Sequence, residues 1–564
     1  MKISLISVHP DLQSFGIRSI SACLKAEGHN VDLIFLQDRQ FKDKYIDKTM
    51  DDLGKLVKES DLIGITLMTN FWDAAIQVTK KIKESSNGLV IWGGTHPTVK
   101  PVECLDYADM VCIGEGEETI MELTRKMTNK EDYFDMKGMG FNNNGKKIIN
   151  GHRDLPGSEK AKVNHLDKLP FQDHDYKSHF VMENKNIVKM NLELTTKLRL
   201  NEFYLTMPTR GCPFACTFCI NSAYLAMHPH QKPIRKRSVD NIIAELKEAK
   251  KLPFTKIILF EDDAFFIMPV KEIKDFSMKY KKHIGIPLVI TGATPSTLTK
   301  EKLALLVDAG LVGMRMGIQT AGEKTKKLYK RPHSNHQVEK AVRMVNEFSH
   351  VKAFYDIILD SPWDADEDSI ETLMFLSKLP TPFQLSLFSL VFFPGTPLYH
   401  KAKEEGIVKD DVRDVYRKYF VEPKKTYLND LFFLLRDYCI IGVGISPIVM
   451  SFLTNKWTKR LHLHKVSHKI LKGLFPFFRT VGRKIRKSTR MYKTGWDYIT
   501  KGKETIDMGS PPIPLGKTIN NTFGNQDSPP NIAFGNDVSV KKDEIPATRT
   551  ADEILSETTI SRYN

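Results

Sequence analysis

The 564-residue sequence has few cysteines and no long uninterrupted apolar run. Its seven cysteines form no even framework, which argues against a disulfide-stapled secreted domain and favours a reducing compartment. The first ten residues lack the apolar core of a signal peptide and are more typical of a first strand. The apolar run 440–453 is too short to span a bilayer. We therefore expect a cytoplasmic protein.

Acidic residues are missing from the segment 456–493, which contains thirteen Lys or Arg and no Asp or Glu. Most of the formal net charge of +15 therefore belongs to this segment, and the rest of the chain is nearly balanced. The overall charge does not by itself indicate a nucleic-acid partner. The length allows three or four domains.

Three of the cysteines lie within eight residues, in the segment T-R-G-C-P-F-A-C-T-F-C-I. Cys212, Cys216 and Cys219 have the spacing C-x3-C-x2-C, which can bind three irons of a [4Fe–4S] cluster and leave the fourth open to a small molecule. The alternatives are a zinc site or a chance cluster. Structural zinc usually takes a second C-x2-C pair, which this sequence lacks.

The residues around these cysteines resemble the cluster loop of the radical S-adenosylmethionine (radical SAM) superfamily, and the resemblance extends over roughly residues 200–400. It implies that S-adenosylmethionine (SAM) binds the open iron through its amino and carboxylate groups. An electron from the cluster would then release a 5′-deoxyadenosyl radical. The resemblance also places the aromatic residue before the last cysteine, Phe218, near the adenine.

Residues 1–128 alternate short apolar runs with amphipathic stretches, which predicts a parallel, doubly wound sheet. The expected strands are 3–8, 31–36, 62–67, 89–92 and 110–113. Ligands of such sheets bind at the carboxyl ends of the strands. Small and hydroxyl residues follow these strands here and permit close approach to a ligand, although glycines there are more often plain turn residues.

The motifs G-G-T-H-P-T-V-x-P and D-M-V-C-I-G-E-G-E-E-T resemble the cobalamin-binding domain fused to many radical SAM enzymes. The resemblance implies that cobalamin lies over the strand ends. The residues it points to are Thr66, Met68, Thr69, Asn70, Gly93, Gly94, Thr95, His96, Gly114, Glu115, Gly116 and Glu117.

The D-x-H-x-x-G motif of other cobalamin proteins is absent, and His9 does not match it. His96 is the candidate axial ligand for cobalt, and its alternative is an ordinary loop histidine in a G-G-x-H-P turn. The resemblance favours cobalt without a histidine below it.

Residues 129–200 are polar, and we interpret them as a linker with a hairpin tip near 142–147. The strand–helix rhythm then resumes over 201–400, with expected strands at 203–206, 256–260, 287–291, 313–318, 354–358 and 384–390. Six strands fit the partial (β/α)6 barrel of the superfamily, whose site faces the carboxyl ends of the strands.

Polar residues at two of these strand ends are candidate SAM ligands. Glu261, Asp262 and Asp263 follow the second expected strand, where the family binds the amino group of the methionine portion; a cationic ligand would stabilise these acids. Arg315 and Gln319 share one face of the fourth strand because side chains alternate along a strand. If that face is inward, Arg315 can bind a carboxylate; the alternatives are a solvated acidic loop and a salt bridge from Arg315 to an acid such as Asp263.

The resemblance fades past residue 400. We expect a helical region at 401–500 and, because Pro, Asn, Ser and Gly dominate there, a disordered tail at 501–564. Within 431–493, two apolar runs precede the cationic segment. This pattern suits an anionic membrane surface, an RNA backbone or a solvated basic helix face. We call the first alternative, in which residues 431–493 attach the protein to the membrane surface, the membrane hypothesis.

Together, the features predict a cobalamin-dependent radical SAM enzyme with a [4Fe–4S] cluster, SAM and cobalamin. A methyltransferase that acts on an unactivated carbon is the first expectation. The alternatives are a cyclase or lipid-modifying enzyme of the same family and, from another class, a corrinoid- or metal-binding sensor without turnover. The expected protein partner is a flavodoxin- or ferredoxin-like electron donor, and nucleic acid is not expected.

Replacing Cys212, Cys216 and Cys219 together by alanine should abolish the cluster. Anaerobically reconstituted wild-type protein should bind about four irons. Iron and sulfide assays and 5′-deoxyadenosine formation check this expectation. Full iron content in the triple variant would contradict it.

Overall fold

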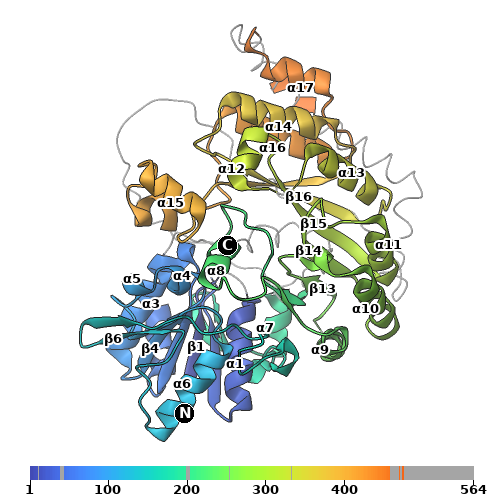
Figure 1. Cartoon of the computed structure of the whole chain (residues 1–564). Coiled ribbons are helices and arrows are strands. Elements are labelled where there is room, and N and C mark those ends of the chain that lie inside the picture. The colour runs from blue at the N-terminus through green and yellow to red at the C-terminus, as the bar shows by residue number, and fades with distance from the viewer. Residues whose placement is uncertain are drawn as a thin grey trace, which may run out of the picture. The chain divides into compact units, whose positions relative to one another are not determined.

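The computed structural model describes residues 1–9, 12–37, 44–198, 203–252, 254–331, 333–457, 469–470 and 473–474. Most of the cationic segment and the whole tail expected at 501–564 lie outside the described residues. Two large sheets organise the described chain, one built from its N-terminal third and one from residues 203–389 (Figure 1).

The N-terminal sheet has the strand order β7-β6-β5-β4-β3-β1-β2-β8-β9. Its five central strands are parallel and confirm the expected doubly wound sheet. They are β1 (Lys2–Ser7), β2 (Asn30–Phe35), β3 (Leu62–Thr66), β4 (Leu89–Gly93) and β5 (Met110–Cys112).

Alternating side chains of these strands pack against two helical layers. Ile3 and Leu5 of β1 lie in one core cluster with residues of α1 (Phe15–Ala26) and α6 (Glu117–Asn129). Ile6 lies in another with residues of α2 (Asp47–Val57) and α3 (Trp72–Ser85). Short helices follow β3 and β4 and complete this domain: η1 (Thr69–Phe71), α4 (Thr95–Val99) and α5 (Pro101–Cys104).

The segment 129–200, which the polar sequence suggested as a linker, extends the first sheet on both sides. One antiparallel hairpin pairs with β5 and the other adds to β2. The strands are β6 (Met139–Asn143), β7 (Lys146–Ile149), β8 (His179–Glu183) and β9 (Asn186–Lys189); η2 (Leu166–Lys168), η3 (Tyr176–Ser178) and α7 (Leu192–Lys197) belong to the same segment. The expected hairpin tip is the β6–β7 turn. The sequence did not predict these strands because each is only four or five residues long and mixes polar with apolar side chains.

The second sheet has six parallel strands in the order β10-β13-β14-β15-β16-β17, as the barrel prediction required. They are β10 (Phe203–Thr206), β13 (Ile257–Phe260), β14 (Leu288–Ala293), β15 (Leu311–Gln319), β16 (Lys352–Leu359) and β17 (Gln384–Ser389). No pairing closes β17 onto β10 in this sheet, so it is a partial barrel.

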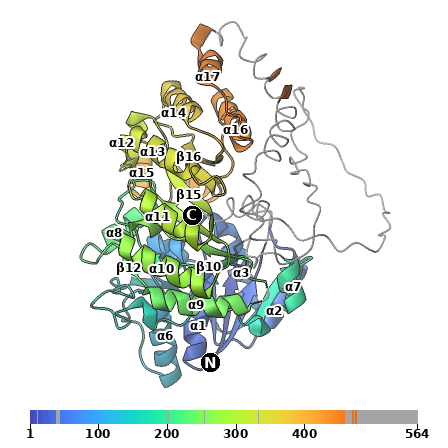
Figure 2. The same cartoon turned by 90° about the vertical axis from the view of Figure 1, so that its right-hand side faces the viewer.

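Helices between these strands cover one face of the sheet. The larger ones are α9 (Val239–Lys251), α10 (Val270–His283), α11 (Lys300–Ala309), α13 (Asn335–Asn346) and α14 (Asp366–Lys378). Figure 2 faces α9, α10 and α11, which lie side by side. Ser238 caps α9 by accepting a hydrogen bond from the Asn241 amide. The remaining elements are β11 (Thr209–Arg210), β12 (Arg235–Lys236), α8 (Ile220–Met227), η4 (Phe265–Ile267) and α12 (Glu323–Tyr329).

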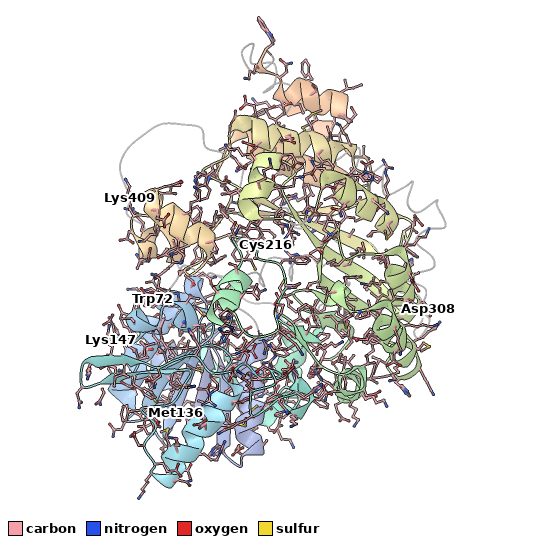
Figure 3. All side chains as sticks on the ribbon, viewed as in Figure 1. Trp72, Met136, Lys147, Cys216, Asp308 and Lys409 are labelled. Carbon is pink, nitrogen blue, oxygen red and sulfur yellow. The ribbon has the colours of Figure 1, made fainter. Side chains whose placement is uncertain are left out.

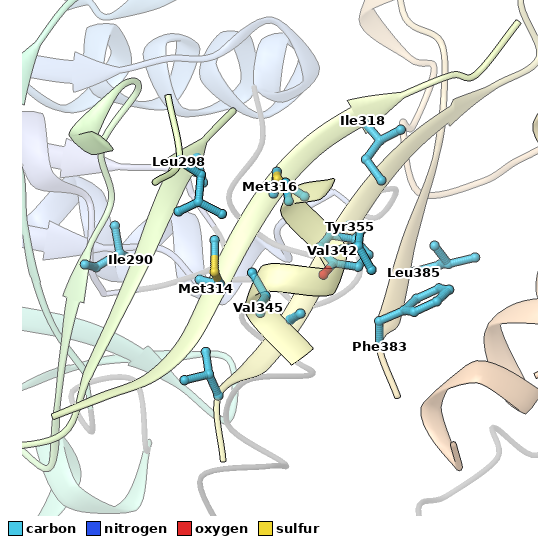
Figure 4. Packing of buried hydrophobic residues seen from close by; sticks show 14 of the residues in the cluster. Ile290, Leu298, Met314, Met316, Ile318, Val342, Val345, Tyr355, Phe383 and Leu385 are labelled. Atoms are coloured by element: carbon cyan, nitrogen blue, oxygen red, sulfur yellow. The ribbon is translucent and has the colours of Figure 1, made fainter. Parts of the chain in front are cut away.

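The main core lies between the second sheet and its helices. Met314, Met316 and Ile318 of β15 pack there against Val342 and Val345 of α13 (Figure 4). These residues alternate with Arg315 and Gln319 along β15, so the polar pair lies on the opposite, inner face of the strand.

After β17 the chain returns to the N-terminal domain through α15 (Pro397–Glu404) and the π-helical turn η5 (Val412–Tyr416). The hydroxyl of Tyr416 donates to Glu103, and its ring packs on Trp72 and His96 at 5.4 and 4.8 Å between centroids. The Lys100 ammonium lies 3.1 Å from Asp411. We call this contact the C-terminal clasp, because it joins residues 397–417 to the first domain.

The first apolar run of the membrane hypothesis belongs to the core. It forms α16 (Tyr427–Ile440), in which Leu431, Phe432, Leu434 and Leu435 are buried against the second sheet and its helices. The second run ends in α17 (Pro447–Thr454), whose outer side is exposed. Within the described part of the chain, no helix combines the length and apolar content that a bilayer crossing needs.

A substitution in α16 should therefore reduce stability. Leu435→Ala should lower the free energy of unfolding by about 2–5 kcal/mol, because it leaves a cavity in the core. Ile448→Ala on the exposed side of α17 is the control, with an expected change within about 0.5 kcal/mol. Chemical denaturation compares the two, and equal effects would place α16 outside the core.

Candidate functional site

The carboxyl ends of β3, β4 and β5 open onto a cavity of about 500 Å³, here called the central cavity. Of the residues predicted to bind cobalamin, those that line it are Thr66, Gly93, Gly94, Thr95, Gly114, Glu115, Gly116 and Glu117. At two of them the backbone has a conformation that favours glycine. Gly94 and Gly114 have φ angles of +106° and +86°, and a Cβ on Gly94 would lie 2.8 Å from the Leu67 carbonyl oxygen.

The central cavity continues between α1 and α6 as an apolar slot, which the sequence analysis missed. Its walls are Leu5, Ile17, Ile20, Gly64, Ile91 and Ile120. The signal available in the sequence was Gly64, a glycine in the middle of a strand, which often marks the close approach of a ligand.

Met68, Thr69, Asn70 and His96 do not line the central cavity. His96 is fully buried, and both ring nitrogens face protein partners: Nε2 lies 3.0 Å from Glu103 Oε1 and Nδ1 lies 3.1 Å from Thr69 Oγ1. Burial lowers the pKa of His96. The structure therefore makes His96 a packed loop histidine rather than a ligand for cobalt.

The opposite wall comes from the second domain. Arg210, Gly211, Cys212, Tyr224, Leu225 and Asp263 line the central cavity from that side. The predicted cysteine loop and the predicted cobalamin loops thus share one cavity. This meeting of distant segments is the main geometric feature of the site.

Two segments brace the cysteine loop. Thr217 donates through its amide to the Tyr329 carbonyl at 3.2 Å and through its hydroxyl to the Leu328 carbonyl at 2.7 Å. The Leu398 amide donates to the Thr217 carbonyl at 2.9 Å. The segments that contain Leu328 and Tyr329 on one side and Leu398 on the other therefore hold the loop in place.

The three cysteines are free thiols and precede α8 in the chain; Cys216 is labelled in Figure 3. Burial raises the pKa of Cys212 and of Cys219 to about 12, so they ionise only when a cation binds. Phe218 lies beside Tyr329, at 5.1 Å between ring centroids.

In the described ranges, no three His, Cys, Asp or Glu side chains are grouped as the ligands of a single metal ion would be. Thiols that bind three different irons of a cluster need not converge in that way.

The acids after β13 have separate roles. Asp262 is buried and accepts hydrogen bonds from the Thr209 amide and hydroxyl, at 2.9 and 2.7 Å, and from the Ala264 amide at 2.8 Å. Burial raises its pKa to about 7. Asp263 faces the central cavity, and desolvation by the surrounding protein raises its pKa as well. Glu261 does not line the cavity, so Asp263 is the acid available to a cationic ligand there.

Arg315 lies on the inner face of the second sheet, as its alternation predicted, and its charge is balanced by Asp356. Its Nε lies 2.8 and 3.0 Å from the two carboxylate oxygens, and its guanidinium stands 5.2 Å from the Phe388 ring centroid. The salt-bridge alternative therefore describes it, with Asp356 in place of Asp263. Gln319 at the end of β15 has a φ of +65° and a buried Oε1 without a hydrogen-bond partner.

A buried ion-pair network joins the two walls of the cavity. Arg210 Nη1 and Nη2 donate to Glu115 at 2.8 Å and to Glu117 at 2.6 Å, and Arg235 Nη2 lies 2.5 Å from Glu115. Burial acts to raise the pKa of Glu115, but the two guanidinium groups hold it at about 2. Sequence reasoning missed both arginines, because their partners are about a hundred residues away.

Two family models match the chain. The B12 binding domain matches residues 1–124, and the radical SAM superfamily matches residues 206–373. An uncharacterised methyltransferase of Pyrococcus horikoshii is 27% identical over 365 residues, which cover 63% of this chain and 72% of that protein. The bacteriochlorophyllide d C-8(2)-methyltransferase of Chlorobaculum tepidum is 21% identical and covers 73% and 81%. An anaerobic magnesium-protoporphyrin IX monomethyl ester cyclase of Rubrivivax gelatinosus is 21% identical and covers 74% and 73%.

Solved structures share the fold at low identity. The radical SAM methyltransferase TsrM from Kitasatospora setae, with cobalamin and a [4Fe–4S] cluster bound, aligns with a TM-score of 0.56 at 16% identity and covers 72% of this chain and 75% of that one. The cobalamin-dependent SAM radical enzyme OxsB gives a TM-score of 0.56 at 14% identity and covers 88% and 81%.

The residues present fit the cofactors that the two domains imply. Cys212 lines one wall of the central cavity from the braced loop that also carries Cys216 and Cys219, while small residues and an apolar slot form the other wall. Asp263 provides a carboxylate beside the cysteine loop for a cationic group of SAM. Cobalamin, a [4Fe–4S] cluster and SAM are therefore the cofactors of this chain.

A bulky side chain in the central cavity should exclude corrinoid. Gly16→Trp is suited to this test, because a Cβ at Gly16 meets nothing within 4 Å and its φ is not positive, unlike that of Gly94. Corrinoid bound after anaerobic reconstitution, read from the visible spectrum, should fall at least tenfold. Gly151→Trp, at an exposed glycine outside the cavity, is the matched control. Unchanged corrinoid content in Gly16→Trp would remove cobalamin from this cavity.

The two neighbouring acids should respond differently to substitution. Asp263→Asn should weaken SAM binding by roughly tenfold, since a hydrogen bond to a charged group is worth about 1.5–3 kcal/mol, and should leave stability unchanged. Asp262→Ala should lower the free energy of unfolding by about 1–3 kcal/mol, because it leaves buried donors without acceptors. Isothermal titration with SAM and thermal unfolding separate the two. Equal SAM affinities for Asp263→Asn and wild type would rule Asp263 out.

Proposed function

We propose that this chain, a cobalamin-dependent radical SAM enzyme by its two domains, is a methyltransferase that acts on an unactivated carbon of an apolar substrate. The observation that carries the proposal is the central cavity, which Cys212 and Asp263 line on one side and the strand-end loops of the B12 binding domain on the other. A methyl donor and a hydrogen-abstracting radical must reach the same substrate, so both must open onto one space.

When bound, the cluster would supply an electron for the cleavage of SAM to methionine and a 5′-deoxyadenosyl radical, and cobalamin would supply a methyl group taken from a second SAM. Cys212, Cys216 and Cys219 would hold the cluster, and the strand-end loops of the B12 binding domain would hold cobalamin. The chain's own residues hold and orient the cofactors and the substrate. Asp263 would bind the amino group of SAM, and Tyr224 and Leu225 of α8 form a wall of the cavity. Enclosure keeps water and other reactive partners away from a radical.

The names of the relatives support methyl transfer, because two of them are methyltransferases. The cyclase relative supports the alternative in the same family, ring formation or another carbon–carbon bond on a lipid or tetrapyrrole-like substrate. A non-catalytic corrinoid or metal sensor would have no use for a braced three-cysteine loop beside an acid. We further propose a flavodoxin- or ferredoxin-like protein as the electron donor.

Product analysis tests the proposal. Enzyme loaded with cluster and cobalamin is incubated under reducing conditions with SAM and an extract of cells from which the gene has been deleted, since such an extract retains the unmodified substrate. A methyltransferase should form S-adenosylhomocysteine and 5′-deoxyadenosine in equal amounts over many turnovers. Methyl-labelled SAM should transfer its label to one extract component.

The alternatives give other results. A cyclase should form 5′-deoxyadenosine without a matching amount of S-adenosylhomocysteine, and a sensor should form neither. The Cys212→Ala variant is the control for chemistry that does not depend on the cluster. Either alternative outcome would contradict methyl transfer.

A further inference from the structure

The outer side of α17 is an apolar surface close to the end of the described chain. Ile448 is 83% exposed and Trp457 is 70% exposed. Val449 is exposed as well, and α17 is the uppermost helix in Figure 1. We call the exposed side chains of Ile448 and Val449 on α17, together with the exposed Trp457 that follows the end of the helix, the α17 face.

The inner side of the same helix fixes its orientation. Met450 and Leu453 are buried in the core of the second domain, and the Tyr427 hydroxyl donates to the Leu453 carbonyl at 3.0 Å. Ser446 caps the helix by accepting a hydrogen bond from the Val449 amide. The helix therefore cannot turn its apolar residues inward, and the α17 face stays directed outward.

The sequence that continues from this face is strongly cationic. From Lys456 to Lys493 there are thirteen Lys or Arg and no acid. Apolar and aromatic side chains next to a cation-rich stretch complement an anionic lipid surface, which offers both an acyl boundary and negative headgroups. An RNA backbone has no use for exposed Ile and Val side chains, and a protein partner would not require so many cations without an acid.

We propose that the α17 face docks this enzyme on an anionic membrane surface. The apolar side chains enter the headgroup boundary, and the cations that follow strengthen the attachment. This refines the membrane hypothesis drawn from the sequence, because α16 belongs to the core and only α17 and the residues after it remain available. The proposal does not depend on the reaction that the central cavity carries out.

Vesicle co-sedimentation of the full-length protein tests it. The wild type should bind phosphatidylcholine vesicles that contain phosphatidylglycerol at least tenfold better than pure phosphatidylcholine vesicles, and more weakly as salt increases. The double variant Ile448→Ser, Trp457→Ser should lose roughly tenfold of that binding and most of the part that persists at high salt. Met278→Ser, at a methionine that is 56% exposed on α10, is the matched control and should bind as the wild type does.

Three results would overturn the proposal. The first is equal binding of the double variant and the wild type. The second is binding to RNA with no preference for anionic vesicles. The third is a wild-type dimer that becomes a monomer in the double variant, which would assign the face to a second copy of the chain. Thermal unfolding of the double variant should match the wild type, because both residues are exposed.

A second observation concerns the cysteine loop. Arg331 follows α12, after Lys330 has turned the chain with a φ of +50°. Its Nη1 lies 3.3 Å from the Cys216 sulfur, and its Nη2 donates to the Gly317 carbonyl at 2.7 Å. One hydrogen bond thus fixes the guanidinium to the second sheet while the other reaches a predicted cluster ligand.

We infer that Arg331 is a positioning residue that sets the reduction potential of the cluster. A donor on a ligating sulfur and a positive charge beside it both stabilise the reduced, more negative cluster. Arg331 should therefore raise the potential and make the cluster easier to reduce. The inference rests on the proposed role of Cys216 but needs no substrate.

Redox titration of the reconstituted cluster, followed by electron paramagnetic resonance, tests this role. Arg331→Met should reduce the equilibrium constant for one-electron reduction about tenfold, a potential lower by about 59 mV. Arg331→Lys keeps the charge and should fall between Arg331→Met and the wild type. Lys330→Met removes an exposed charge one residue earlier and should match the wild type.

Iron content is measured for each variant. An unchanged potential in Arg331→Met or Arg331→Lys with full iron would overturn the assignment, as would an equal shift in Lys330→Met. Loss of iron from both Arg331 variants would also overturn it, because Arg331 would then serve cluster binding rather than potential. Failure of methyl transfer alone would leave these readings unchanged, so the two proposals fail independently.

Discussion

The ion pairs of Arg210 with Glu115 and Glu117 hold the two walls of the central cavity together. The acids follow β5 of the first sheet, and the arginine stands two residues before Cys212 of the second domain. A buried charge is costly unless it is paired, so each wall stabilises the charges of the other. Because of this pairing, the carboxyl ends of two separate sheets can face a common space.

The central strands of both sheets could be predicted from the sequence, because buried parallel strands appear as apolar runs separated by helical patterns. The hairpins β6–β7 and β8–β9 could not be placed in the same way. Each of their strands is only four or five residues long, and so short a segment of mixed polar and apolar residues has no distinctive pattern. The run 431–435 was open to a membrane interpretation because apolar residues look alike in a core and at a bilayer.

Within the site, local motifs predicted more than single residues did. The cysteine loop and the loops after β4 and β5 all contribute residues that line the central cavity. His96, Asp262 and Arg315 have the right chemistry and the right strand positions, but nearby partners occupy them: Glu103, Thr209 and Asp356. Such pairings depend on tertiary contacts, and sequence spacing carries no trace of them.

The C-terminal clasp has a consequence for how the enzyme exchanges what it holds. The chain crosses from the first domain to the second, then returns, and the Tyr416 ring packs on both Trp72 and His96. The two domains are thus joined at the beginning and the end of the second, and they cannot part by a simple hinge. Any motion that widens the central cavity by parting the two domains must therefore break this aromatic contact as well as the ion pairs of Arg210.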